Sequence, residues 1–283
     1  MAAVEAVANY HCTVGENPRW HEGEGRLYWL DIETGRLFRV EHETGAHECF
    51  YQGPVVGGFT FQADGSLLLF EADRIVSLGP TLERRVLAEG IDPDMARFND
   101  CIADPEGRVF VGTIGRTEES GGLYRVDRDG RVTSLFKGTG CANGMGFTRD
   151  LTGFYWTCST TRTIDRFDYD RATGALANRR RFYDAPESEG TPDGLTLDQD
   201  DRVWTTRWGG SAVLCLDTSG ALVSRIELPV ERVSACAFGG PNLDVLYVTT
   251  AGGKEGADTA DGTLYRVPVG TRGRTEFRSS VRL

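Results

Sequence analysis

The sequence of 283 residues predicts an all-β fold, a six-bladed β-propeller with four-stranded blades, and three observations support it. A hairpin unit recurs six times: a strand of alternating apolar and polar residues, a turn, and a second strand with a large apolar residue near its start. These apolar markers follow one another at intervals of 40 to 49 residues, the period of a propeller blade. They are Tyr28, Leu68, Phe110, Tyr155, Trp204 and Tyr247. The 36 glycines suit many tight turns, and no long helical period competes with this pattern.

The fifth copy of the hairpin is the clearest. Leu195 and Leu197 alternate with polar neighbours as in a half-buried strand, residues 198–201 form an acidic turn, and residues 202–206 begin the next strand. The other copies run over residues 18–28, 58–68, 99–110, 143–155 and 234–247. A second strand pair is expected to follow each hairpin and to complete a four-stranded blade. Its outer strands are recognised from three near copies, residues 36–41, 122–127 and 263–267.

The two ends of the chain are both strand-like. Residues 4–12 and 276–283 are expected to meet in the last blade and close the ring, which would remove the exposed sheet edges. No linker, low-complexity run or change of composition divides the sequence. A single propeller domain over residues 1–283 is therefore predicted.

Charge and composition restrict the partners. The net charge of −11 disfavours nucleic acid and anionic membrane surfaces, and no stretch approaches the ~18 consecutive apolar residues of a membrane span. Residues 1–9 lack a basic region and carry Glu5, so no secretion signal is expected. The seven cysteines are far apart and never form a Cys-x-x-Cys pair, which is typical of reduced, buried thiols in a cytoplasmic protein.

A set of polar residues recurs at one position of the repeat. Counting back 11 or 12 residues from each marker leads to a carboxylate or carboxamide in four blades: Glu16, Asn99, Asn143 and Asp193. In the second blade the count reaches Val56 or Gly57, and in the sixth it reaches Ala235 or Cys236, so these two blades are expected to leave space or an apolar wall. Because the first strand of a propeller blade lines the central channel, the four polar side chains are expected to converge on one cavity.

Two interpretations of these residues stay open. In the first they only cap strands or bind water, and in the second they bind a cation. Two carboxylates and two amides without a lysine among them would repel one another and carry a desolvation cost unless a cation balanced them. Oxygen ligands suit a hard divalent ion such as Ca²⁺, Mg²⁺ or Mn²⁺, and Fe²⁺ or Zn²⁺ held through oxygen also fits.

Five short motifs in order carry a family resemblance. They are residues 15–20, 97–100, 143–144, 192–194 and 236–241. At blade spacing they resemble the SMP-30, gluconolactonase and regucalcin family, and the similarity covers nearly the whole chain. The resemblance implies a six-bladed propeller, a metal ion held by Glu16, Asn143 and Asp193, and a substrate gripped by Arg97 and Asn99. Where some members have a further acidic substrate contact, this chain offers Glu118 or Glu119, of which Glu118 is preferred.

The function expected from the resemblance is metal-dependent hydrolysis of an aldonolactone, a pentono- or hexonolactone, to the sugar acid. The metal would polarise the lactone carbonyl, and Asp193 would also accept a proton from the attacking water. Arg97 offers a planar donor fork to the substrate and Asn99 offers a donor and an acceptor, although a surface pairing of Arg97 with Asp100 is an equal alternative. Trp208 is either a sugar-stacking wall or plain packing.

Two other classes of function stay open: a calcium-binding regulatory propeller, and a metal-dependent hydrolase of aryl esters or organophosphates. Arg97 beside Asn99 favours a hydroxyl-rich substrate over an aryl ester. Residues 138–143 begin like a dinucleotide-binding loop but lack the third glycine and a following helix. No Gly-x-Ser-x-Gly motif occurs, and all four histidines lie in the first fifty residues, which disfavours a Ser-His-Asp triad.

Overall fold

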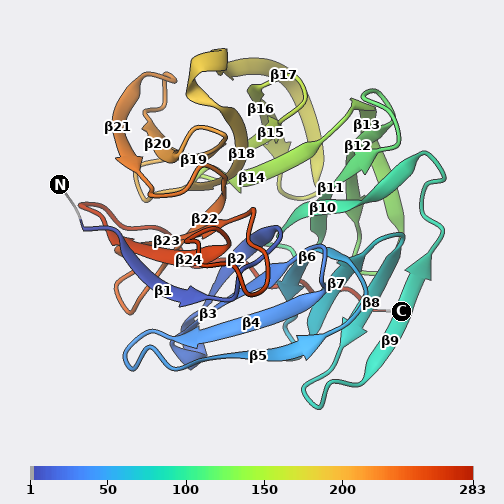
Figure 1. Cartoon of the computed structure of the whole chain (residues 1–283). Coiled ribbons are helices and arrows are strands. Elements are labelled where there is room, and N and C mark those ends of the chain that lie inside the picture. Colours follow the sequence, from blue (N-terminus) through green and yellow to red (C-terminus); the bar gives the residue numbers. More distant parts are fainter. Residues whose placement is uncertain (1–2, 283) are drawn as a thin grey trace. The chain divides into compact units, whose positions relative to one another are not determined.

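The computed structural model describes residues 3–282, and its regular secondary structure is almost entirely β-strand. Its 24 strands form six antiparallel sheets of four strands each (Figure 1). The prediction of a six-bladed β-propeller with four-stranded blades is confirmed. The only helical segments among the described residues are two short 3₁₀ turns, η1 (Glu22–Glu24) and η2 (Glu187–Glu189). No helix in this part of the chain has the length and apolar character needed to cross a membrane.

The six blades fall into two compact units of three blades each. The first unit holds the described residues up to Gly53 together with Ala185–Glu276. Blade 1 comprises β2 (Gly15–His21), β3 (Arg26–Asp31), β4 (Arg36–Glu41) and β5 (His47–Gln52). Blade 5 comprises β18 (Thr191–Leu197), β19 (Val203–Trp208), β20 (Ala212–Leu216) and β21 (Leu222–Glu227). Blade 6 comprises β22 (Val233–Gly239), β23 (Val245–Thr250), β24 (Thr263–Pro268) and β1 (Glu5–Asn9).

The second unit holds Pro54–Asp184 and the chain from Phe277 onward. Blade 2 comprises β6 (Val56–Phe61), β7 (Leu67–Glu71), β8 (Arg74–Leu78) and β9 (Arg84–Glu89). Blade 3 comprises β10 (Met95–Ala103), β11 (Val109–Gly115), β12 (Gly121–Val126) and β13 (Val132–Thr139). Blade 4 comprises β14 (Ala142–Phe147), β15 (Gly153–Cys158), β16 (Thr163–Asp170) and β17 (Ala175–Asp184). The single domain over residues 1–283 stays a prediction.

Aspartates at the ends of strands fix the tight turns between them. Asp198 Oδ1 accepts hydrogen bonds from the main-chain nitrogens of Asp200 (2.9 Å) and Arg202 (3.0 Å). Asp104 and Asp217 each bind the nitrogens two and four residues further on in the same way. Because such a side chain satisfies main-chain donors that the turn leaves unpaired, aspartate is favoured at this position, and the acidic turns expected from the sequence are present.

The hydrophobic core of each unit lies between adjacent blades. In the second unit the ring of Phe70 on β7 meets that of Phe98 on β10, with ring centroids 5.4 Å apart in an edge-to-face arrangement. In the first unit Trp204 on β19 meets Phe238 on β22 in the same manner at 5.8 Å. Fully burying a side chain of this size stabilises the fold by about 1.5–3 kcal/mol. The inner strands β10 and β22 are therefore held by large apolar contacts with a neighbouring blade.

The two chain ends behave differently from each other. β1 pairs antiparallel with β24, so the N-terminal segment is the outer strand of blade 6, as predicted. The C-terminal segment does not join that blade, and this part of the prediction was wrong. β24 already pairs with β23 on one edge and β1 on the other, and it has no edge left.

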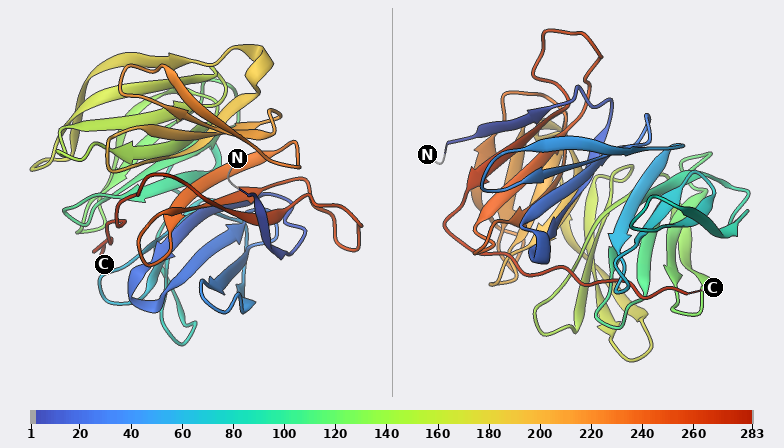
Figure 2. Two further views of the ribbon diagram at one scale, coloured as in Figure 1. Left: turned by 90° about the vertical axis from the view of Figure 1, so that its left-hand side faces the viewer. Right: turned by 90° about the horizontal axis from the view of Figure 1, so that it is seen from below.

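The C-terminal segment, the dark red trace that ends at C in Figure 2, runs over the turns of the second unit. Ser279 donates its main-chain N–H to the Phe61 carbonyl (2.9 Å), and Ser280 donates to the Gly107 carbonyl (2.8 Å). The buried Val281 packs into the apolar cluster between blades 2 and 3. The segment thus ties these two blades together.

The cysteines are reduced thiols, as predicted. Five of the seven are buried, but Cys49 is exposed and Cys141 is only partly buried, so the prediction that all are buried was wrong for these two. Cys49 lies on β5, the outer strand of its blade, where one face is open to solvent.

Candidate active site and metal centre

A β-bulge interrupts the first strand of every blade at the same place. The pairing of β2 with β3 shifts between Glu16 and Arg19, and that of β14 with β15 shifts between Asn143 and Met145. The corresponding shifts fall between residues 56 and 58, 98 and 101, 192 and 195, and 233 and 235. A bulge bends its strand and redirects the side chains beside it. The repeat therefore carries a built-in irregularity where the candidate residues lie.

The strand register places the four polar residues at one structural position. Each marker pairs with a residue of the preceding strand, namely Arg19, Ile102, Gly146 and Thr196 in blades 1, 3, 4 and 5. Glu16, Asn99, Asn143 and Asp193 each lie three residues before that partner. All four are buried, with exposed fractions of 5 to 6%. We call the residue that lies three positions before the partner of the marker the bulge position of its blade.

The same rule corrects the expectation for blade 6. Tyr247 pairs with Ala237, so the bulge position is held by Ser234 and not by Ala235 or Cys236. The count along the sequence fell short because ten residues separate Ala237 from its partner Tyr247, whereas the marker and its partner are eight or nine residues apart in the other blades. Blade 6 thus presents a hydroxyl at this position instead of an apolar wall.

In blade 2 the bulge position is Gly57, as expected. A Cβ atom at Gly57 would lie 2.0 Å from the Phe98 carbonyl oxygen. No residue with a side chain fits there, because the main chain of β10 passes directly against it.

In the first unit the two predicted carboxylate ligands lie on strands that flank β22. β2, with Glu16, and β18, with Asp193, both pack against this strand (Figure 1). Glu16 Oε2 accepts a hydrogen bond from the Asn17 main-chain nitrogen at 2.7 Å. Asn17 has a positive φ of 52°, a conformation that asparagine adopts more readily than most residues, and its Oδ1 accepts from Arg19 Nε at 3.3 Å. The Glu-Asn pair therefore forms the bulge and orients the carboxylate.

In the second unit the two predicted substrate residues contact each other. Arg97 Nη1 donates to Asn99 Oδ1 at 2.6 Å, and Asn99 Nδ2 donates to the Ala142 carbonyl at 2.9 Å. Ala142 immediately precedes Asn143, whose own Nδ2 donates to Ser159 Oγ at 3.3 Å. These bonds orient both amide groups and connect blade 3 to blade 4. Asp100 accepts the main-chain N–H of Cys101 at 2.8 Å.

The loop with the two candidate glutamates crosses the start of blade 4. Glu118 and Glu119 are both exposed, on the turn between β11 and β12. A Cβ atom at Gly140 would lie 3.0 Å from the Glu118 Cα. The main chain of Glu118 therefore passes close to Gly140, which is three residues before Asn143 in the sequence. Ser120 Oγ holds the loop by donating to the Asp94 carbonyl at 2.9 Å. The assignment of Glu118 as a substrate contact stays a prediction.

Trp208 is half-buried at the end of β19. The Arg232 guanidinium lies over its ring, 5.6 Å from the centroid. One face of the indole is thus occupied by the protein, which favours the packing interpretation over sugar stacking.

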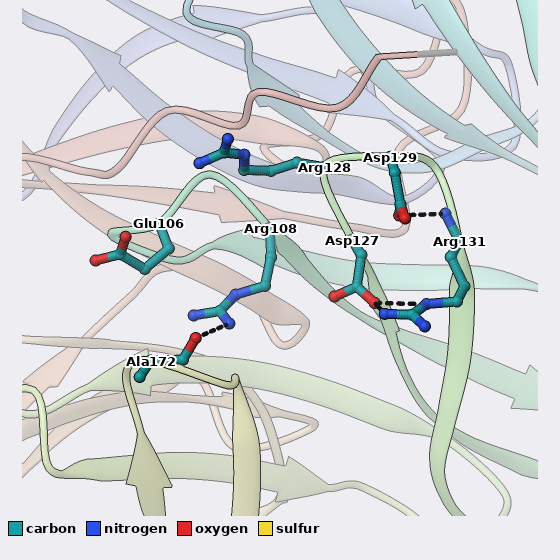
Figure 3. A pocket seen from close by; sticks show the side chains of 7 residues that line it. All are labelled: Glu106, Arg108, Asp127, Arg128, Asp129, Arg131 and Ala172. Carbon is teal, nitrogen blue, oxygen red and sulfur yellow. Dashed lines mark hydrogen bonds and ion pairs between the residues drawn. The ribbon is translucent and has the colours of Figure 1, made fainter.

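A cavity of about 350 Å³ in the second unit is lined by none of the candidate residues of that unit (Figure 3). It is lined by Glu106, Arg108, Asp127, Arg128, Asp129, Arg131 and Ala172. Glu106 and Arg108 flank the turn at the far end of β10 from Asn99. The charged groups bind one another, with Arg131 Nη2 3.1 Å from Asp127 Oδ2 and Arg108 Nη1 donating to the Ala172 carbonyl at 3.2 Å. This cavity is therefore a separate feature of the hairpin turns.

The chemistry of the predicted ligands fits a hard divalent cation. Glu16 and Asp193 supply carboxylate oxygens and Asn143 supplies an amide oxygen, the donors that Ca²⁺, Mg²⁺ and Mn²⁺ prefer. Within residues 3–282 no group of three or more His, Cys, Asp and Glu side chains is arranged to hold a metal ion.

These features define a six-bladed propeller whose inner strands carry buried oxygen donors at one position of the repeat. Residues 14–252 match the family model described as the SMP-30/Gluconolactonase/LRE-like region, and the chain belongs to this family. The chain is 47% identical to the pentonolactonase XacC of Haloferax volcanii over 289 residues, which cover 99% of both chains. It is 30% identical to regucalcin of Macaca fascicularis over 90% of this chain and 88% of that protein. The crystal structure of a calcium-binding protein, regucalcin, from Agrobacterium tumefaciens superposes with a TM-score of 0.91 at 26% identity, covering 100% of this chain and 98% of that one.

Proposed function

We propose that this protein is a metal-dependent lactonase that hydrolyses an aldonolactone, a pentono- or hexonolactone, to the sugar acid. The similarity to a pentonolactonase along the whole chain carries this proposal. The bulge position supports it, because it presents buried carboxylates and amides in four blades. A small-molecule sugar lactone is the proposed partner. The free cysteines support a cytoplasmic location, and the net charge of −11 disfavours nucleic acid and anionic membrane surfaces as partners.

The proposed metal ligands are Glu16, Asn143 and Asp193, holding one divalent ion drawn from Ca²⁺, Mg²⁺, Mn²⁺, Fe²⁺ and Zn²⁺. When bound, such an ion acts as a Lewis acid toward a carbonyl oxygen. The three side chains hold equivalent positions in their blades and are all buried, which supports a shared role. The hydrogen bond from the Asn17 nitrogen to Glu16 restricts one ligand before any cation arrives.

Lactone hydrolysis adds one water across the ring ester bond, so that the carbonyl carbon gains the hydroxyl and the ring oxygen gains a proton. Asp193 is the proposed catalytic residue, as the acceptor of the proton that the attacking water loses. A carboxylate has two oxygens, and one of them can serve as a ligand while the other takes the proton. Asp193 therefore combines both roles in this proposal.

Arg97, Asn99 and Glu118 are the proposed substrate contacts. The bond between Arg97 Nη1 and Asn99 Oδ1 holds the guanidinium in one orientation, and its remaining N–H groups can donate to substrate hydroxyls. The exposed Glu118 carboxylate would accept hydrogen bonds from those hydroxyls. Such a polar set suits a hydroxyl-rich lactone better than an aryl ester.

The experiment compares aldonolactones of five and six carbons, an aryl ester and a phosphotriester as substrates, with and without chelator, by the acid released. Hydrolysis of an aldonolactone that stops on chelation and returns with a divalent cation is expected. Full activity in protein verified to be metal-free would contradict the metal's role. If the enzyme hydrolyses the aryl ester or the phosphotriester faster than any aldonolactone, the proposed substrate class is wrong and the faster substrate takes its place. Metal binding with no turnover of any substrate would favour a calcium-binding regulatory protein.

A further inference from the structure

Ser234 is a fully buried hydroxyl residue that the sequence did not single out. It holds the bulge position of β22, the same position that Glu16 holds in β2 and Asp193 holds in β18. β22 packs against both of these strands. Ser234 therefore lies on the strand through which the two carboxylate-bearing strands of the first unit are connected.

The Ser234 hydroxyl is hydrogen-bonded toward blade 1. Its Oγ donates to the main-chain carbonyl of Gly15, the residue before Glu16, and lies 3.1 Å from Thr249 Oγ1. Gly15 is also held from β23, because a Cβ atom there would lie 2.6 Å from the Thr250 carbonyl oxygen. The main chain that leads to Glu16 thus lies against blade 6, where the Ser234 hydroxyl binds the residue directly before Glu16 and Val14 pairs with Ala251.

A second hydroxyl makes the equivalent connection to blade 5. Thr206 Oγ1 lies 2.6 Å from the Ser234 carbonyl oxygen and 3.1 Å from the Gly194 carbonyl oxygen, and it donates to this pair. Gly194 directly follows Asp193. A Cβ atom at Gly194 would lie 2.7 Å from the Ala235 Cα, so β18 approaches β22 as closely as glycine permits.

We propose that Ser234, together with Thr206, is a positioning residue that sets the placement of the Glu16 and Asp193 carboxylates as metal ligands. The inference rests on the proposed function, since it assumes that these two carboxylates bind the ion. Both hydroxyls act through the main chain next to a ligand and touch neither carboxylate. Removing a partner that orients a metal ligand typically lowers metal affinity by about 10–100-fold.

The test measures metal binding directly. Ca²⁺ and, separately, Mn²⁺ are titrated into metal-free wild type, Ser234→Ala and Thr206→Val by calorimetry, without substrate. The variants remove only the hydroxyl or replace it by a methyl of similar size. Each is expected to bind the ion about 10–100-fold more weakly than wild type. Thermal unfolding of every variant is followed in parallel.

Ser279→Ala is the matched control. Ser279 is also fully buried, and its hydroxyl pairs with Thr60 Oγ1 at 2.7 Å, but it contacts the far end of β6 from Gly57. A lowered unfolding temperature with unchanged metal affinity is expected for this control.

If Ser234→Ala and Thr206→Val unfold at lower temperature but bind metal as wild type does, their role is structural only and the inference is overturned. If Ser279→Ala loses as much metal affinity as Ser234→Ala and Thr206→Val do, the inference is also overturned. The loss would then follow from removing any buried hydroxyl and not from the position of Ser234 or Thr206. If wild type itself binds neither ion, Glu16 and Asp193 do not form the proposed site for these ions and the inference is overturned, whereas the proposed function is decided separately by the lactone assay with and without chelator. A folded Thr206→Val with weakened binding supports the inference even if Ser234→Ala does not fold.

Discussion

A methyl group at Gly57 is the perturbation that most directly tests how β10 positions the substrate residues. Gly57 holds the bulge position of blade 2, and β6 packs against β10, which carries Arg97 and Asn99. A Cβ atom added to Gly57 would lie 2.0 Å from the Phe98 carbonyl oxygen and 3.0 Å from the Asn99 main-chain nitrogen. Both neighbours are main-chain atoms. No rotation of a side chain can relieve the contact.

The size of the effect follows from this overlap. Real Cβ atoms essentially never approach another heavy atom within 3.0 Å, so the two strands must separate by at least 1.0 Å, the difference between 3.0 and 2.0 Å. Overpacking of this kind costs about 1–3 kcal/mol of folding free energy. A misplacement of ~1 Å at a substrate-binding group lowers the rate on the order of 10²-fold. Gly57→Ala should therefore fold with reduced stability and lose about 100-fold in kcat/KM for an aldonolactone.

The assay is the initial rate of aldonolactone hydrolysis at several substrate concentrations, together with thermal unfolding. Gly270→Ala is the control, because a Cβ atom there meets nothing within 4 Å and the backbone is not in the left-handed region. It should match wild type in both measurements. A folded Gly57→Ala with wild-type kcat/KM would refute the reasoning, since β10 could then move by 1 Å without consequence for the substrate.

Three further predictions concern the C-terminus, the ion pair between the buried Asp92 and Lys137, and the proposed metal ligands. Deleting residues 277–283 removes the buried Val281 side chain and should lower stability by at least ~1.5–3 kcal/mol; an unchanged unfolding temperature would mean that the segment adds nothing. Burial alone would raise the pKa of Asp92, but the Lys137 ammonium at 2.7 Å and the Tyr124 hydroxyl together lower it by more, and the net pKa lies below its usual value. This contribution to stability is present above an unfolded-state pKa of ~3.9 and is lost as the pH falls through the folded-state pKa, so Asp92→Asn should unfold at a lower temperature at neutral pH and converge on wild type in strong acid. Asp193→Asn should stay inactive at saturating metal whereas Glu16→Gln recovers; equal recovery, measured by titration and initial rates, would make Asp193 a ligand only.

The sequence alone determined the number of blades, the hairpins and four of the bulge positions. Strands of one hairpin are separated by a short turn, so their pairing depends on residues close together in the chain. The alternation of apolar and polar residues sets which face is buried, and a marker such as Trp204 therefore locates Asp193 by simple counting. The same local rule located Glu16, Asn99 and Asn143.

The tertiary structure decided what depends on contacts between distant segments. Ser234 replaced the two apolar residues expected in blade 6, and its hydroxyl binds Gly15, 219 residues away in the sequence. The C-terminal segment left blade 6 because β1 had taken the open edge of β24. Gly57 is required because the main chain at Phe98 lies where a side chain would be. Sequence periodicity describes each strand by itself, whereas these outcomes depend on how closely the main chains of different blades approach, which is set by side-chain volume and free hydrogen-bonding edges.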